Sequence, residues 1–290
     1  MTVRVRRRAA WAAGPLLSVG VSLGMTPTVE GVETSPTSGP QAPRELSCVR
    51  ASGPVHVDGR ADEDAWRDAV WTEPFVDIRG DSVARPPLAT RARLLWDDQF
   101  LYVHADMEEP HIWATLTEHD DIVWQENDFE VFLDPDGNGL DYFEVEVNAL
   151  GVVLDLFMGQ PYWMGGRAQL GWDSPGLRVG VDLRGTLNDP SDRDAGWSVE
   201  LAIPWADLSV PDSETPGAPP AEGDVWRVNF SRVTWPLEVR DGRYAKAEEG
   251  TADEAHPESN WVWSPQGVID MHRPERWGRV RFVGLRGEVR

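Results

Sequence analysis

The chain has 290 residues, of which 41% are hydrophobic, enough to close a sizeable core and to exclude a largely disordered protein. Its formal net charge of −22 repels phosphate backbones, so we do not expect a nucleic-acid partner. A single cysteine, Cys48, excludes an internal disulfide and a thiolate metal cluster. Fifteen tryptophans indicate either a Trp-rich core or a site built on flat aromatic faces.

The N-terminus has the composition of an export signal. Arg4, Arg6, Arg7 and Arg8 precede a mostly apolar run over residues 9–23, which ends in small residues. We expect residues 1–24 to be a signal peptide and the protein to be secreted or periplasmic, with a disordered basic leader as the alternative. The apolar run is too short and too interrupted for a membrane span. Residues 25–45 are rich in Pro, Ser, Thr and Gly and predict a linker, which places the folded domain at residues 46–290.

Short alternating segments bounded by Gly, Pro, Asn and Asp predict an all-β domain from Leu46 onward. The expected strands cover residues 90–96, 100–108, 151–158, 177–183, 197–203, 225–235 and 279–283. Two-residue alternation over residues 128–133 and 143–147 predicts two more. Helical signal is confined to a turn over residues 62–69, capped by Asp62, and a second turn after Pro204. No repeat of propeller or solenoid length is present. We therefore predict one antiparallel β-sandwich, jelly-roll-like, with one or two short helices.

Alternating acidic residues after the alternation over residues 128–133 form a candidate calcium loop. Asp134, Asp136, Asn138 and Asp141 place oxygen atoms at intervals around glycines, which suits a hard cation. The loop lacks a complete EF-hand. The alternative is a plain hairpin turn, since Asp, Asn and Gly all tolerate positive φ.

A second acidic segment, residues 118–130, surrounds Trp124 with carboxylates and amides, among them Asn127 and Glu130. An indole face stacks on a pyranose ring, while carboxylates and amides bond its hydroxyls, so this segment predicts a sugar site. The alternative is that Trp124 is a core residue. Trp261 and Trp263 share one strand face further on, where a core position is favoured over a binding platform.

Several segments in fixed order resemble carbohydrate-binding module family 9. They are residues 57–66 (VDGRADEDAW), 94–103, 127–134 (NDFEVFLD), 142–151, 196–205 and 263–278. The resemblance covers about residues 55–282. It implies an antiparallel β-sandwich, structural calcium, and a polysaccharide or oligosaccharide held between two tryptophans.

The resemblance also assigns individual positions. Trp124 falls at the first stacking tryptophan and Glu130 at a sugar-binding glutamate. The second tryptophan is replaced by Met271 or His272, and an expected arginine is replaced by Glu146. His272 is then expected to stack or bond the sugar, with Trp261 or Trp163 as candidates for the missing aromatic face.

Two other functions stay open at this point. Paired carboxylates such as Glu130, Glu144, Glu146 and Glu200 suggest a glycoside hydrolase as an alternative to pure binding. A haem-binding sandwich is more remote, because the adjacent Met271 and His272 point to opposite faces on a strand. The sequence leaves the oligomeric state and the identity of the sugar open.

Overall fold

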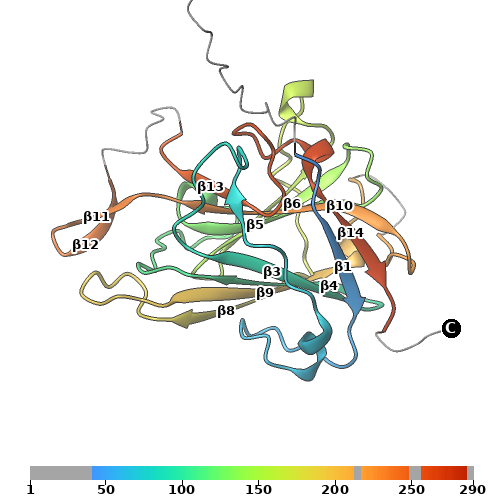
Figure 1. Cartoon of the computed structure of the whole chain (residues 1–290), viewed down its shortest axis with the longest axis horizontal. Helices are drawn as coiled ribbons and strands as arrows, with labels where there is room; N and C mark the ends of the chain where they lie inside the picture. The colour runs from blue at the N-terminus through green and yellow to red at the C-terminus, as the bar shows by residue number, and fades with distance from the viewer. Residues whose placement is uncertain (1–40, 212–216, 248–255, 286–290) are drawn as a thin grey trace, which may run out of the picture. The chain divides into compact units, whose positions relative to one another are not determined.

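The computed structural model describes residues 41–211, 217–247 and 256–285. The predicted signal peptide, and the predicted linker up to residue 40, lie outside these residues. Within them the all-β prediction is confirmed (Figure 1). The strands are β1 (Glu45–Arg50), β2 (Val76–Asp77), β3 (Thr90–Trp96), β4 (Phe100–Met107), β5 (Asp128–Asp134), β6 (Tyr142–Asn148), β7 (Val153–Met158), β8 (Arg178–Arg184), β9 (Gly196–Pro204), β10 (Val225–Thr234), β11 (Leu237–Arg240), β12 (Arg243–Lys246), β13 (Ser259–Val262) and β14 (Gly278–Val283).

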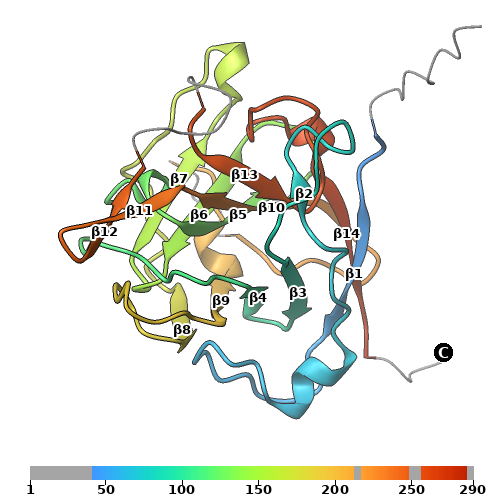
Figure 2. The ribbon, with the colours of Figure 1, turned by 60° about the vertical axis from the view of Figure 1, so that its left-hand side comes forward.

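The main strands form one curled sheet in the order β7-β6-β5-β10-β14-β1-β3-β4-β9-β8. Its two halves face each other and make the sandwich, as the turned view shows (Figure 2). Most neighbours are antiparallel, but β1 pairs in parallel with both β14 and β3, as in the pairs Glu45↔Arg279 and Val49↔Leu95. β1 is thus the seam that joins the halves. β13 pairs with β10 and β2, and β11 with β12 forms a separate hairpin.

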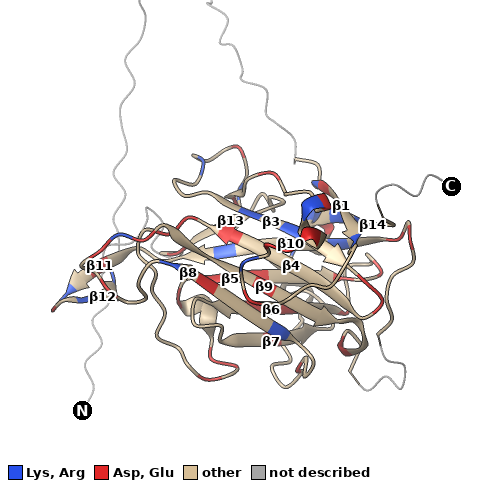
Figure 3. Ribbon diagram, turned by 90° about the horizontal axis from the view of Figure 1, so that it is seen from below, with Lys and Arg blue, Asp and Glu red and all other residues tan. Residues whose placement is uncertain are grey.

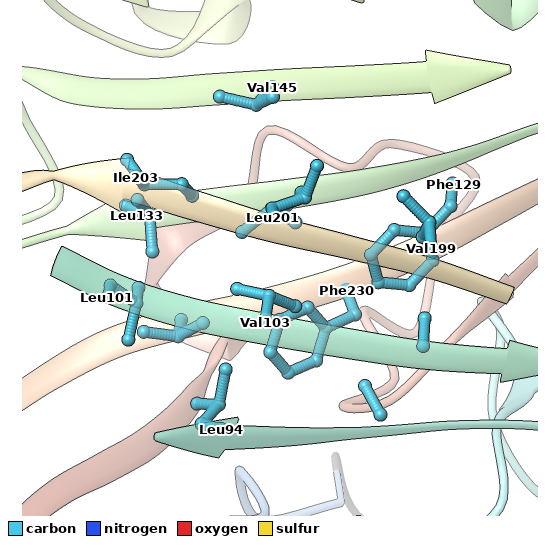
Figure 4. Packing of buried hydrophobic residues seen from close by; sticks show 14 of the residues in the cluster. Leu94, Leu101, Val103, Phe129, Leu133, Val145, Val199, Leu201, Ile203 and Phe230 are labelled. Carbon is cyan, nitrogen blue, oxygen red and sulfur yellow. The ribbon is translucent and has the colours of Figure 1, made fainter. Parts of the chain in front are cut away.

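The core lies between the two halves and follows from the two-residue alternation of the strands. Phe129, Val131 and Leu133 of β5 point inward and are fully buried, as predicted. Leu94 of β3 and Leu201 of β9 belong to the same cluster (Figure 4). Burying each such side chain contributes about 1.5–3 kcal/mol, so this cluster is a main source of stability.

The short helices of the described residues are all of the 3-10 type. They are η1 (Asp64–Asp68), η2 (Val123–Gln125), η3 (Tyr162–Met164), η4 (Trp205–Asp207) and η5 (Pro274–Arg276). η1 and η4 lie where helical turns were predicted. The predicted cap is wrong, since Glu63 precedes η1 and no side chain caps it. No helix among the described residues is long and apolar enough to cross a membrane.

The acidic residues of the candidate site lie on β5 and β6. Figure 3 colours the Asp and Glu positions of the ribbon red. Asp128 and Glu130 alternate with the core residues of β5, and Glu144 and Glu146 alternate with those of β6. They share a face, as predicted, but they are not solvated: each is at most 5% exposed. Segments from other parts of the chain cover this face and leave a cavity over it.

Candidate functional site

A cavity of about 770 Å³ lies over the outer face of β5, β6 and β7. Aromatic side chains line it from two sides, with Trp124 and Trp235 on one and Tyr162 on another. Glu130, Glu144 and Glu146 also line it, from the strands beneath. The cavity therefore combines flat apolar surfaces with a carboxyl-lined floor.

Trp124 sits on η2, in a segment that is anchored on both sides. Val123 is fully buried, and the backbone N–H of Glu126 closes the turn on the Val123 carbonyl at 2.8 Å. The buried Glu126 carboxylate then accepts N–H bonds from Thr115 and Leu116, at 2.8 and 3.1 Å. The loop is fixed, so the Trp124 indole is held 42% exposed at the cavity. The sequence prediction of a surface position, instead of a core position, agrees with this exposure.

Trp235 is the second tryptophan of the cavity. It follows β10 directly, and its indole nitrogen donates to the Trp124 carbonyl oxygen at 2.9 Å. Its backbone N–H donates to Oδ1 of Asn127 at 2.8 Å. The Lys246 ammonium lies 3.5 Å from the centre of its ring. Sequence reasoning missed Trp235 because it was taken as the last residue of the strand over 225–235.

Asn127 was predicted to bind the ligand. It is buried, its Nδ2 donates to Glu109 at 3.3 Å, and its Oδ1 accepts the Trp235 bond. It is not among the described residues that line the cavity. In the structure, Asn127 positions Trp235 through this hydrogen bond.

The floor carboxyls come from directly paired strands. Glu130 lies opposite Glu146, and Asp128, two pairs further along, lies opposite Asn148. In Asp128, Glu130, Glu144 and Glu146, one oxygen atom each has no hydrogen-bond partner among the described residues. Burial raises the pKa of Glu130 to about 7, and burial, followed by the neighbouring carboxyls, raises the pKa of the other three well above the ordinary range.

His272 lines the cavity beside this floor. Its Nδ1 lies 2.8 Å from the Tyr142 hydroxyl, and its Nε2 lies 3.9 Å from Glu144. The Tyr162 ring packs edge-on against it at 4.4 Å between centroids. Burial lowers the pKa of His272 to about 4, so the ring is neutral at pH 7. With both ring nitrogens facing protein groups, the arrangement does not favour a haem ligand.

Trp261 does not belong to this cavity. It is 6% exposed in the core cluster, and the guanidinium of Arg232 lies 5.1 Å from the centre of its ring. Trp263 is fully buried as well. Both tryptophans therefore occupy core positions, as the sequence favoured. The alternative that Trp261 provides a sugar-binding face is wrong. Trp163 is 54% exposed but lines a separate hollow with Arg273.

The Asp134 loop has the geometry of a hairpin turn. The two carboxyl oxygens of Asp134 accept N–H bonds from Gly137 and Gly139, both at 2.9 Å, and these glycines adopt positive φ. Burial raises the pKa of Asp134 to about 6, and the neighbouring Asp136 adds to the shift. A carboxylate oxygen has two acceptor sites, so the bonds that hold the turn do not by themselves exclude a cation at Asp134.

A further polar cluster includes Asp155 of β7. Nε2 of His119 is within 3.3–3.6 Å of carboxyl oxygens of Asp120, Asp155 and Asp173. The four residues are spread over more than fifty positions, so sequence spacing gave no signal of the cluster.

The fold is a β-sandwich, and its cavity combines aromatic side chains with a floor of carboxyl groups. These features define a class of protein that binds ligands which have both polar groups and flat apolar faces. The family model described as carbohydrate family 9 binding domain-like matches residues 57–231, which is more than half of the chain. The chain belongs to this family, and the predicted resemblance is confirmed.

Similar proteins agree with this assignment. Endo-1,4-beta-xylanase C of Paenibacillus barcinonensis is 30% identical over 92 residues, and exoglucanase XynX of Acetivibrio thermocellus is 25% identical over 170 residues. These matches cover 32% and 58% of this chain, but only 8% and 13% of the two relatives. The chain therefore corresponds to a small part of each.

Among solved structures, a family 9 module from Caldicellulosiruptor kristjanssonii, in complex with cellotriose, matches with a TM-score of 0.52 and 16% identity. The match covers 85% of this chain and 97% of that module. A protein from Bacteroides uniformis matches with a TM-score of 0.58 and 17% identity, over 83% of this chain and all of that one. At such identities these likenesses show the fold.

Proposed function

We propose that the chain binds carbohydrate in the cavity over β5–β7, as a binding domain without catalytic activity of its own. The observation that carries the proposal is the placing of Trp124 and Trp235, joined by a hydrogen bond, beside a floor of carboxyl groups. The ligand class is an oligosaccharide or a polysaccharide segment. Family membership supports the same assignment, and no specific observation favours the hydrolase alternative.

Two kinds of side chain in the cavity would contact different parts of the sugar. The indole faces remove the apolar C–H surface of a pyranose from water, while Glu130, Glu146 and His272 offer polar atoms to its hydroxyl groups. Each neutral hydrogen bond contributes a net of only about 1 kcal/mol, because both groups lose water on binding. The affinity is therefore expected to depend strongly on aromatic contact.

Calorimetric titration of the full chain with glucose, cello-oligosaccharides and xylo-oligosaccharides tests the proposal. Saturable binding is expected, and Trp124→Ala should abolish it. Trp163→Ala is the matched control, because Trp163 is an exposed tryptophan, at 54% against 42% for Trp124, and is not among the residues that line the cavity. Binding that is equal in both variants places the sugar elsewhere, and absence of binding to the whole panel overturns carbohydrate binding.

Calcium at Asp134, Asp136, Asn138 and Asp141 is a second part of the proposal. The closely placed carboxyls of Asp134 and Asp136 favour it, and the ion would stabilise the turn instead of contacting the ligand. Metal analysis of protein dialysed without chelator is expected to find calcium, and Asp136→Asn to reduce the bound fraction. Calcium that is absent, or unchanged in the variant, argues for the turn alone.

We also propose export, which the arginine-rich start and apolar run of residues 1–24 favour. The mature chain is expected outside the cytoplasm, either secreted or in a periplasm. Fractionation of the native host, with sequencing of the mature N-terminus, tests this. A cytoplasmic chain that retains residues 1–24 contradicts it.

A further inference from the structure

We propose that the cavity selects a carbohydrate with a protonated amine, an amino sugar whose ammonium group is held by Glu130 and Glu146, with Glu144 also lining the cavity. The inference rests on the proposed function and adds a substrate class to it. Three separate features carry it: the geometry of the floor, the charges of the surrounding residues, and the aromatic walls.

The geometry of the floor fits a small donor group. Carboxyl oxygens of Asp128, Glu130 and Glu146 all lie within 4.8 Å of one another. Three oxygens around an ammonium nitrogen at hydrogen-bonding distance stand about 4.6 Å apart, since charged N–H···O contacts are about 2.8 Å long. An ammonium group has three donors and no acceptor, which complements a cluster of acceptor oxygens.

These oxygens are otherwise unused. Glu130, Glu144 and Glu146 are each at least 95% buried, and one oxygen of each lacks a hydrogen-bond partner among the described residues. All three line the cavity, and Asp128, which is completely buried, adds a fourth carboxyl behind Glu130. Buried acceptors without a partner are costly, so the site gains free energy when a donor reaches them.

The charges of the surrounding residues leave the floor unbalanced. Of the described residues that line the cavity, five are acidic and none is lysine or arginine. Two of the five have their own partners: Asp270 pairs with Arg273 at 2.9 Å, and Glu258 lies 3.4 Å from His256. Among the described residues, the three floor glutamates make no ion pair with lysine or arginine, and His272, 3.9 Å from Glu144, is neutral at pH 7.

The nearby cations of the fold are committed elsewhere. The Lys246 ammonium packs on the Trp235 ring. Arg232, on the same strand as the cavity residue Val233, points to the opposite face and pairs with Glu109 at 2.8 Å. Burial favours the protonated form of these carboxyls. An ammonium group favours their ionised form instead and pairs with it in a region of low dielectric, where charge pairs are strong, whereas a neutral hexose forms no such pair.

The walls indicate an organic ligand in place of a bare ion. Trp124, Trp235 and Tyr162 present aromatic surface along the cavity, which a metal ion does not use and a pyranose ring does. The stacked ring brings a substituent toward the floor, so the aromatic contact and the ammonium contact are made by one ligand.

Three β-1,4-linked disaccharides that differ only at carbon 2 provide the test: the glucosamine, glucose and N-acetylglucosamine forms. Calorimetric titration of the full chain at pH 7 is expected to show at least about tenfold tighter binding of the glucosamine form, as one charge-assisted contact gives. Glu146→Gln keeps the shape of the side chain and is expected to bring the glucosamine and glucose forms to within about twofold of each other. Glu144→Gln provides a second variant if Glu146→Gln fails to fold by circular dichroism.

The outcomes separate this inference from the proposed function. Trp124-dependent binding of the glucose form, with no preference for the amine, overturns the inference and leaves carbohydrate binding standing. Binding that requires added calcium and is lost with chelator, with no amine preference, assigns the floor to a metal ion and overturns the inference as well. Absence of binding to all three sugars overturns both.

Discussion

The indole nitrogen of Trp235 donates a hydrogen bond of 2.9 Å to the backbone carbonyl oxygen of Trp124. The two tryptophans are 111 residues apart in the sequence, yet this hydrogen bond fixes the position of the Trp235 ring relative to Trp124. Asn127 reinforces it through the Trp235 backbone. The aromatic part of the cavity is therefore pre-organised, which reduces the entropy lost when a ligand binds.

Trp235→Phe tests this coupling, because it retains an aromatic face and removes the indole donor. We expect sugar affinity to fall by about 0.5–1.5 kcal/mol, the net contribution of one such bond, when measured by calorimetry. Sugar affinity in Trp235→Phe equal to that of the parent chain contradicts a positioning role for this bond.

Glu109→Ala should strongly destabilise the fold. Glu109 pairs with Arg232 at 2.8 Å, and both side chains are at most 5% exposed. Removing one partner leaves a buried, uncompensated charge, which costs about 3–5 kcal/mol. Urea unfolding measures the change. Arg67→Ala breaks the exposed pair with Asp64 and is the control, where we expect less than about 1 kcal/mol.

Stability should decrease as the pH rises from about 5 to about 8. Burial raises the pKa of Glu130 to about 7, and raises the pKa of Glu144 and Glu146, relative to the unfolded chain. For such groups the stabilising effect is complete below the unfolded pKa and is lost as the pH passes the folded pKa. The slope is at most about 1.4 kcal/mol per pH unit for each group. Glu146→Gln should flatten the profile in thermal unfolding, whereas the exposed Glu275→Gln should leave it unchanged.

Gly180→Ala should disturb the packing of the 58–59 turn on β8. A Cβ atom at Gly180 would lie 2.6 Å from the backbone of Asp58. This turn is held by Glu200 of β9, which accepts N–H bonds from Asp58 and Gly59 at 3.0 and 2.8 Å. We expect the free energy of unfolding, measured by chemical denaturation, to fall by about 1–3 kcal/mol. Gly171→Ala meets nothing within 4 Å and should change stability little; an equal loss there would contradict the steric explanation.

The fold was predictable because strand alternation is a local signal. Within the seven residues of β5, the alternation of Phe129, Val131 and Leu133 with polar residues predicts which face points inward, and the structure confirms it. Strands β1, β2 and β13 escaped prediction because their residues pair with distant partners, such as Val76 with Val262. No sequence window contains both members of such a pair.

The candidate site was predicted only in part, for a similar reason. Trp124, Glu130, Glu146 and His272 do meet in one cavity. Trp235 was missed because its importance depends on a contact with a residue far away in sequence. Glu146 was expected on a polar face, and nothing local to β6 indicated that other segments would cover that face and exclude water.

The seam at β1 has a consequence for the order in which the protein folds. Residues 45–49 pair with residues 279–283, across almost the whole length of the domain. Folding rates fall as contacts become more distant in sequence, because the chain must close a large loop before the contact stabilises it. During synthesis, the first strand must therefore wait for the last one before the sandwich closes, and until then the apolar edge of β3 that β1 covers remains available for incorrect pairing.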